Sequence, residues 1–151
     1  MDSQLTGTAY HEAAHAVALK VKGVDVLKVE ITTDDSGETV PEPEAFRMMS
    51  DDDVVTVALV GMYAESEVIK ENSLAIALAI LNGAVSDRAF FADRFKPYWN
   101  SRADLARQIA HNKAKKFIEG HWAEIARVAE AVLAKPGLPK VLNRGEIWPG
   151  S

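Results

Sequence analysis

The stretch TAYHEAAHAVALKV, residues 8–21, decides the fold that we expect of this chain. Alanine, valine and leucine make up most of it, and Thr6 or Thr8 can cap its start, so the pattern predicts a helix that ends near residues 20–23. Because apolar residues occupy almost all sides of this helix, we expect it to be buried in the core.

Three polar residues interrupt the predicted helix and form the motif H-E-x-x-H. His11 and His15 are four residues apart, so on a helix their Cβ atoms lie about 5–6 Å apart on one face and both imidazoles can bind one metal ion. Glu12 projects beside such an ion, where its carboxylate can take a proton from zinc-bound water. The motif therefore predicts two zinc ligands and a general base.

The same histidines have a simpler interpretation, as core residues bonded to backbone carbonyl groups, because a five-residue motif can arise by chance. Polar groups inside a buried helix need partners of some kind, since each unpaired group costs several kcal/mol. Ala13 and Ala14 lie between the histidines and let other elements approach the helix closely. We therefore favour the metal site.

Length and composition predict a single globular domain, residues 1–151, with a sizeable core. The 151 residues are 48% hydrophobic, and the net charge of −5 offers no basic surface for nucleic acid. Without cysteine, a metal must be held by histidine and carboxylate. The N-terminus lacks a signal-peptide pattern, and the longest apolar run, residues 74–81, is short of the roughly 20 residues of a membrane span. We expect a cytoplasmic protein without a membrane span.

The rest of the chain predicts helices and very little strand. Residues 24–31 alternate between apolar and polar and predict the one well-marked strand, with a short second strand around residues 38–40 inside a loop. The acidic residues 51–53 predict the start of a helix that continues to about residue 70. Further helices are predicted at residues 74–81, 86–96, 101–118 and 122–133, with a bend or break at Gly120 and at most a helical turn in residues 141–148.

A catalytic zinc site needs a third protein ligand, and the chain offers several carboxylates and histidines for this role. The candidates are Glu65, Glu67, Asp87, Asp104, His111 and His121. The charged surroundings of His111 and His121 favour surface positions. The pattern alone does not choose among these residues.

Five segments of the sequence resemble the peptidase domain of the FtsH-type membrane AAA+ zinc proteases. Residues 8–17 are similar to the T-A-x-H-E-A-G-H-A signature of that family, and the likeness covers most of the chain, although only this first motif is specific. The other similar segments are residues 26–31, which resemble the next strand; residues 59–67, which resemble the L-x-G-x-x-A-E-E helix; residues 83–87, which resemble the G-A-x-N-D segment; and residues 114–138, which resemble the C-terminal helical hairpin.

The resemblance implies a mainly α (α+β) fold, a helical zincin-like peptidase domain with one small β-strand or hairpin after the HExxH helix. It implies that Zn²⁺ is held by His11, His15 and Asp87, and that Glu12 is the catalytic base. Asp104 is the second choice for the third ligand, because its D-L-x-x-A setting is also similar to the family sequence after the aspartate. Asp104 lies close to the C-terminal hairpin, where the family has an ordinary helix.

Departures from the family limit the function that we expect. Ala14 replaces the usual glycine, Ser86 replaces the usual asparagine, and the segment after Asp87 is much shorter. The chain contains no G-x-x-x-x-G-K-[ST] phosphate loop, so we expect a stand-alone, ATP-independent metallopeptidase that hydrolyses unfolded proteins or short peptides. The alternative is a catalytically silent, peptidase-like binding module that holds a partner in its cleft. An exposed Trp99 or Trp148 would offer a surface for a homo-oligomer, although lone aromatics beside prolines more often pack against their own domain.

Overall fold

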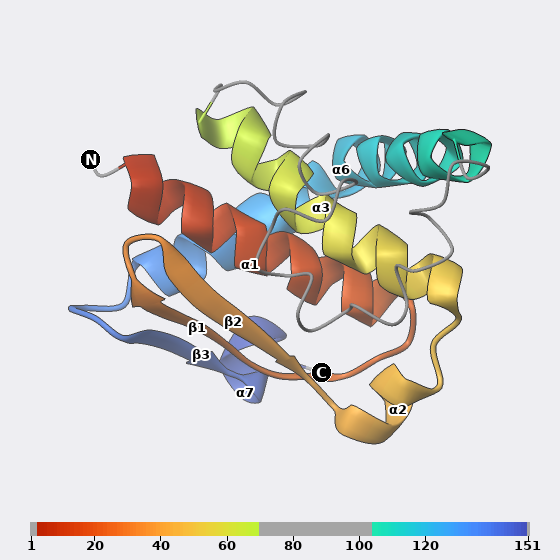
Figure 1. The fold of residues 1–151 in the computed structure, drawn as a ribbon. Helices are drawn as coiled ribbons and strands as arrows, with labels where there is room; N and C mark the ends of the chain where they lie inside the picture. The colour runs from red at the N-terminus through yellow and green to blue at the C-terminus, as the bar shows by residue number, and fades with distance from the viewer. Residues whose placement is uncertain (1–2, 70–103, 151) are drawn as a thin grey trace.

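The protein has a mainly helical α+β fold in which three long helices pack beside a small antiparallel sheet (Figure 1). A computed structural model describes residues 3–69 and 104–150. The long helices are α1 (Ser3–Val21), α3 (Asp51–Ile69) and α6 (Asp104–Leu133), the short helices are α2 (Pro43–Arg47) and α7 (Arg144–Ile147), and the strands are β1 (Val26–Thr33), β2 (Ser36–Pro41) and β3 (Lys140–Asn143).

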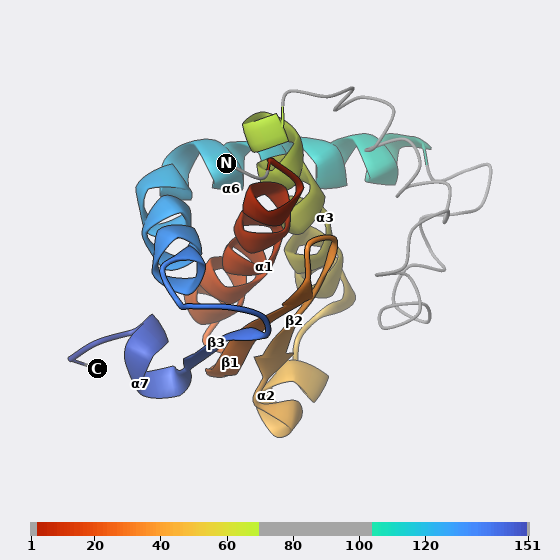
Figure 2. The ribbon, with the colours of Figure 1, turned by 90° about the vertical axis from the view of Figure 1, so that its left-hand side faces the viewer.

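Helix α1 lies at the centre of this fold, in contact with α3, α6 and the sheet (Figures 1 and 2). Its alanine side chains are fully buried on several sides, as the apolar sequence predicts, and their small size lets the neighbouring elements come close. The helix begins at Ser3, earlier than a cap at Thr6 or Thr8 would place it. Thr8 instead lies inside the helix, where its hydroxyl donates to the carbonyl oxygen of Asp34 at 2.7 Å and so joins α1 to the β1–β2 turn.

The sheet has the strand order β2-β1-β3, and both pairs are antiparallel. The predicted strand and its short second strand are confirmed as the β1–β2 hairpin, in which Val29 pairs with Thr39. On the other side of β1, Val29 pairs with Leu142 of β3. The expectation of at most a helical turn in residues 141–148 is therefore wrong for the part that forms β3, and it is confirmed for α7, which is a single helical turn. A strand of four residues shows no clear periodicity, and β1 supplies the hydrogen bonds that make it a strand.

Helix α6 bends where the sequence predicts, beside Gly120. His121 leaves the helical conformation, with φ −125° and ψ 16°, and its Nδ1 donates to the carbonyl oxygen of Phe117 at 3.0 Å. After the bend, Trp122 stacks on Tyr10 of α1 with ring centroids 5.3 Å apart. The bend thus lets the second half of α6 pack along α1, next to the HExxH motif.

Trp148 is buried, so of the two expectations for this residue the structure supports packing against its own domain. Its side chain is only 7% exposed, and the Nζ atom of Lys20 lies 3.9 Å from the ring centroid. The ring packs against its own domain and offers no surface for self-association. Trp99 and the helices predicted at residues 74–81 and 86–96 lie outside the described residues.

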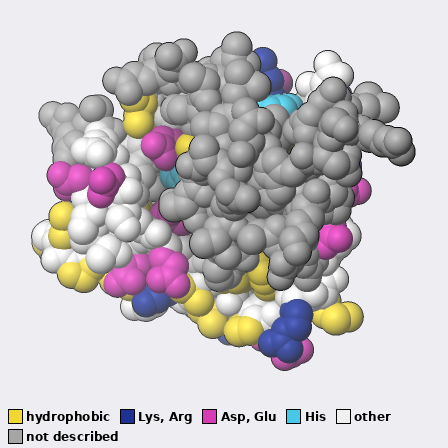
Figure 3. Space-filling model, in the orientation of Figure 1, with side chains coloured by type: hydrophobic (Ala, Val, Ile, Leu, Met, Phe, Trp, Pro, Cys, Tyr) yellow, Lys and Arg dark blue, Asp and Glu magenta, His cyan; other side chains and the backbone are white. Residues whose placement is uncertain are grey.

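The surface and the helices of the described part give two further observations. Acidic side chains are prominent on the face drawn in Figure 3, in agreement with the net charge of −5. Among the helices that the structure describes, none combines the length and the apolar character needed to cross a membrane.

Candidate metal centre

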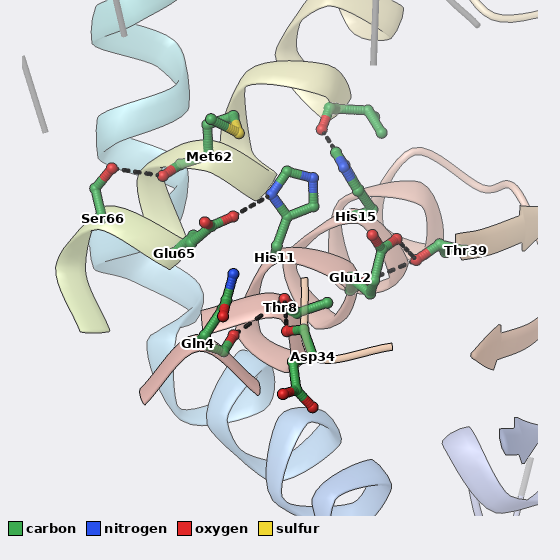
Figure 4. Close-up of polar contacts among 11 residues, drawn as sticks. Gln4, Thr8, His11, Glu12, His15, Asp34, Thr39, Met62, Glu65 and Ser66 are labelled. Atoms are coloured by element: carbon green, nitrogen blue, oxygen red, sulfur yellow. Dashed lines mark hydrogen bonds and ion pairs between the residues drawn. The ribbon is translucent and has the colours of Figure 1, made fainter. Parts of the chain in front are cut away.

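The HExxH motif lies in the middle of α1, buried between α3 and β2 (Figure 4). His11 and His15 point toward α3, and Glu12 points toward Thr39 of β2. The exposed fractions of the three residues are 8%, 6% and 6% for His11, Glu12 and His15. The two predicted histidine ligands and the predicted base therefore lie buried on the same helix.

Each histidine of the motif uses its Nδ1 atom to bond an acceptor on α3. The Nδ1 atom of His11 lies 2.9 Å from Oε1 of Glu65, and that of His15 lies 2.7 Å from the carbonyl oxygen of Val57. A carbonyl or an ionised carboxylate can only accept, so both Nδ1 atoms carry a hydrogen, and in a neutral imidazole Nε2 then holds the lone pair.

This pattern of partners is the one that metal-binding histidines typically have. Such a histidine donates its other ring N–H to a carboxylate or a backbone carbonyl, which fixes the tautomer and the orientation of the ring. The rings of His11 and His15 lie edge to face, with centroids 4.7 Å apart. The donor set and its outer partners fit a zinc ion held through the two Nε2 atoms.

Glu12 is held in place by strand β2. The Oγ1 atom of Thr39 lies 2.8 Å from Oε1 of Glu12 and 2.9 Å from the Glu12 carbonyl oxygen, and the two acceptors share its single hydroxyl hydrogen. Gly37 of the same strand also approaches Glu12 closely. A β-carbon on Gly37 would lie 3.0 Å from Cγ of Glu12 and 2.8 Å from the carbonyl oxygen of Glu30. The strand therefore both supplies a donor to the carboxylate and leaves room for it.

Replacement of Thr39 by valine should destabilise the protein by about 1–3 kcal/mol, because the buried Glu12 carboxylate loses its hydroxyl donor while the volume of the side chain is kept. Urea denaturation measures this loss. Thr33→Val is the matched control, since the Thr33 hydroxyl bonds the exposed Asp35. Equal midpoints for Thr39→Val and the control would contradict the proposed role of Thr39.

Helix α3 carries two of the predicted candidates for the third metal ligand, Glu65 and Glu67. Glu65 bonds the Nδ1 atom of His11, so it is a partner of a ligand and lies on the side away from Nε2. Glu67 is exposed on the same helix. Neither carboxylate is placed as a third ligand to the Nε2 pair.

The two histidines of α6 make their described contacts with residues outside the motif. His111 packs edge to face on Tyr63, with ring centroids 5.5 Å apart, and burial lowers the pKa of its imidazole. His121 bonds the backbone of its own helix at the bend. Both are half-buried rather than fully exposed, because α6 packs against the rest of the helical layer.

The two aspartates that the sequence favours as third ligand cannot be placed against the histidines. Asp87 lies outside the described residues, and Asp104 is the first residue of α6, whose side chain is not described. Within the described part of the chain, no three His, Asp or Glu side chains form a group that could hold a metal ion. The assignment of Asp87 therefore stays a prediction.

Sequence reasoning found the motif on α1 but missed two of the groups that surround it. The Val57 partner is a backbone carbonyl, which no side-chain pattern reveals, and Thr39 lies 27 residues from Glu12 in the sequence. A search for hydroxyl residues in the strand that follows an HExxH helix could have selected Thr39. Comparison of the chain with models of protein families, with curated proteins and with solved structures found no match.

Proposed function

We propose that this protein is a zinc-dependent, FtsH-like metallopeptidase that cleaves peptide bonds in unfolded proteins or short peptides without ATP. The observation that supports this proposal most is the pair of Nδ1 hydrogen bonds, from His11 to Glu65 and from His15 to Val57, beside the buried carboxylate of Glu12. In both rings it is Nδ1 that bonds α3, so in the neutral imidazoles the lone pair lies on Nε2, the nitrogen through which a metal ion would be held.

His11 and His15 would hold the zinc ion, and the family resemblance adds Asp87 as the third ligand. When bound, zinc would supply Lewis acidity, which polarises a peptide carbonyl and makes water more acidic. Glu65 and Val57 keep the two imidazoles in the tautomer that can bind the metal.

Glu12 would perform the proton transfers of the reaction. Its carboxylate takes a proton from the water that attacks the carbonyl carbon of the substrate, and it returns this proton to the amine that leaves when the C–N bond breaks. Glu12 is buried as a residue, with 6% of its surface exposed, and its carboxylate accepts from Thr39, so it has little freedom to turn away from its position. Burial also reduces the screening of its charge by solvent.

Metal analysis of the purified protein tests the proposal. After loading with zinc and desalting, the wild type should retain one zinc ion per chain, Asp87→Ala should retain markedly less, and Asp104→Ala should behave like the wild type. The same samples are then incubated with an unfolded protein substrate. A wild type that retains no zinc would contradict the proposal, and retained zinc without cleavage would support the alternative of a silent binding module.

A further inference from the structure

We infer that Gly61 is a positioning residue for His15: the missing side chain at this position lets the imidazole reach the backbone of α3. The inference goes beyond the proposed function, because it concerns the arrangement of the metal-free protein. The His15 ring lies against two neighbouring turns of α3: it bonds the Val57 carbonyl and fills the space beside Gly61.

The edge of the His15 ring occupies the space that a side chain at position 61 would need. A β-carbon on Gly61 would lie 2.6 Å from both Cε1 and Nε2 of His15, and 3.1 Å from Cδ2 of His11. Non-bonded carbon atoms are most favourable at about 3.5–4.0 Å, so even a methyl group would overlap with the ring. His15 is buried and held through Nδ1, and it cannot move aside without losing that hydrogen bond.

The glycine also explains how a side chain can bond a carbonyl in the middle of a helix. In a regular α-helix the Val57 carbonyl accepts the N–H of Gly61, and its second lone pair remains for another donor. A helical side chain covers the turn that precedes its own Cα, so a side chain at position 61 would lie over this carbonyl. Glycine leaves the carbonyl accessible, and His15 approaches it to 2.7 Å.

The same face of α3 therefore fixes both imidazoles through successive turns. Val57 supplies a carbonyl to His15, Gly61 supplies space for the ring, and Glu65 supplies a carboxylate to His11. Glycine within a helix is unfavourable relative to alanine because of its backbone entropy, so its presence here is explained by the space that it leaves.

A double-mutant cycle on the metal-free protein tests the inference. Gly61→Ala should lower the melting temperature in the wild type, and this loss should disappear in a His15→Ala background, where the ring is absent. Gly120→Ala is the control, since a β-carbon there meets no heavy atom within 4 Å, and its effect should be the same in both backgrounds. Equal losses from Gly61→Ala in both backgrounds would overturn the inference. If Gly61→Ala does not fold, recovery of folding in the double variant supports it and failure to recover overturns it.

Nitrogen NMR of the histidine side chains gives a second measurement, which a general loss of stability would not change. In the wild type the His15 ring should carry its hydrogen on Nδ1, and in Gly61→Ala this preference should be lost while Gly120→Ala keeps it. Retention of the Nδ1–H form in Gly61→Ala would overturn the inference.

Cobalt binding separates this inference from the proposed function. Gly61→Ala should bind Co²⁺ about 10–100-fold more weakly than the wild type, as found when outer partners of metal ligands are changed. A wild type that binds no Co²⁺ would count against the proposed metal site, whereas the thermal cycle and the NMR measurement would still decide the role of Gly61. Equal Co²⁺ affinities in the wild type and the variant would overturn the inference.

Discussion

Replacement of Glu12 by glutamine should slow peptide hydrolysis about 10²–10⁴-fold, which is the usual contribution of a general base. Glutamine has nearly the same shape, and its amide oxygen can still accept from Thr39, whose Oγ1 atom lies 2.8 Å from the carboxylate. The basic oxygen that takes a proton from water is lost, while both histidines are kept. The zinc content should therefore be unchanged, and cleavage of a fluorescently labelled unfolded protein, followed at equal metal loading, measures the effect.

Glu38→Gln is the matched control for this experiment. Glu38 lies in β2 next to Thr39, and its side chain is exposed, so the substitution removes the same charge close to the site without touching the Glu12 carboxylate. Its cleavage rate should equal that of the wild type. Cleavage by Glu12→Gln at the wild-type rate would show that any activity of the sample does not use Glu12, or comes from a contaminant.

Truncation of Ile31 to alanine should have the largest effect on stability, about 2–5 kcal/mol, because it combines lost burial with a cavity. Ile31 is fully buried in β1, close to Gly37 of the neighbouring strand. For a chain of this length, such a loss should lower the melting temperature by about 4–20 °C. Circular dichroism during heating measures the shift.

Leu27→Ala serves as the control in the same strand. The Leu27 side chain is 38% exposed, so its truncation removes less apolar surface from the core and should lower the melting temperature less. Equal shifts for the two variants would mean that the face of β1 that carries Ile31 does not form part of the core.

The long helices could be predicted from the sequence because each carries its own signal. In α3, three aspartates precede an apolar stretch, and the predicted helix over residues 51–70 agrees with the observed one from Asp51 to Ile69, where this described part of the chain ends. In α6, the predicted bend at Gly120 appears at the next residue. Helix α2 and strand β3 carry no such signal, because five and four residues are too short to show a period. Their conformation depends on a capping carboxylate from Glu42 and on pairing with β1.

The motif could be predicted more readily than its surroundings. His11, Glu12 and His15 are close in sequence, and one helix brings them together. The sequence offers Glu65 as a candidate ligand, but whether its carboxylate bonds Nε2 or Nδ1 of a histidine depends on the packing of α1 against α3, which a sequence pattern does not contain. Thr39 depends in the same way on the position of the hairpin beside α1.

The two imidazoles differ in how easily mutation could release them. A single substitution of Glu65 removes the acceptor that holds His11, whereas the acceptor that holds His15 belongs to the main chain and is present whatever side chain stands at position 57. Apolar substitutions of the buried Val57 that keep the core packed, such as Val57→Ile, should therefore leave His15 held, whereas Glu65→Leu should release His11. The main chain therefore supplies the acceptor of one proposed ligand, and a side chain supplies that of the other.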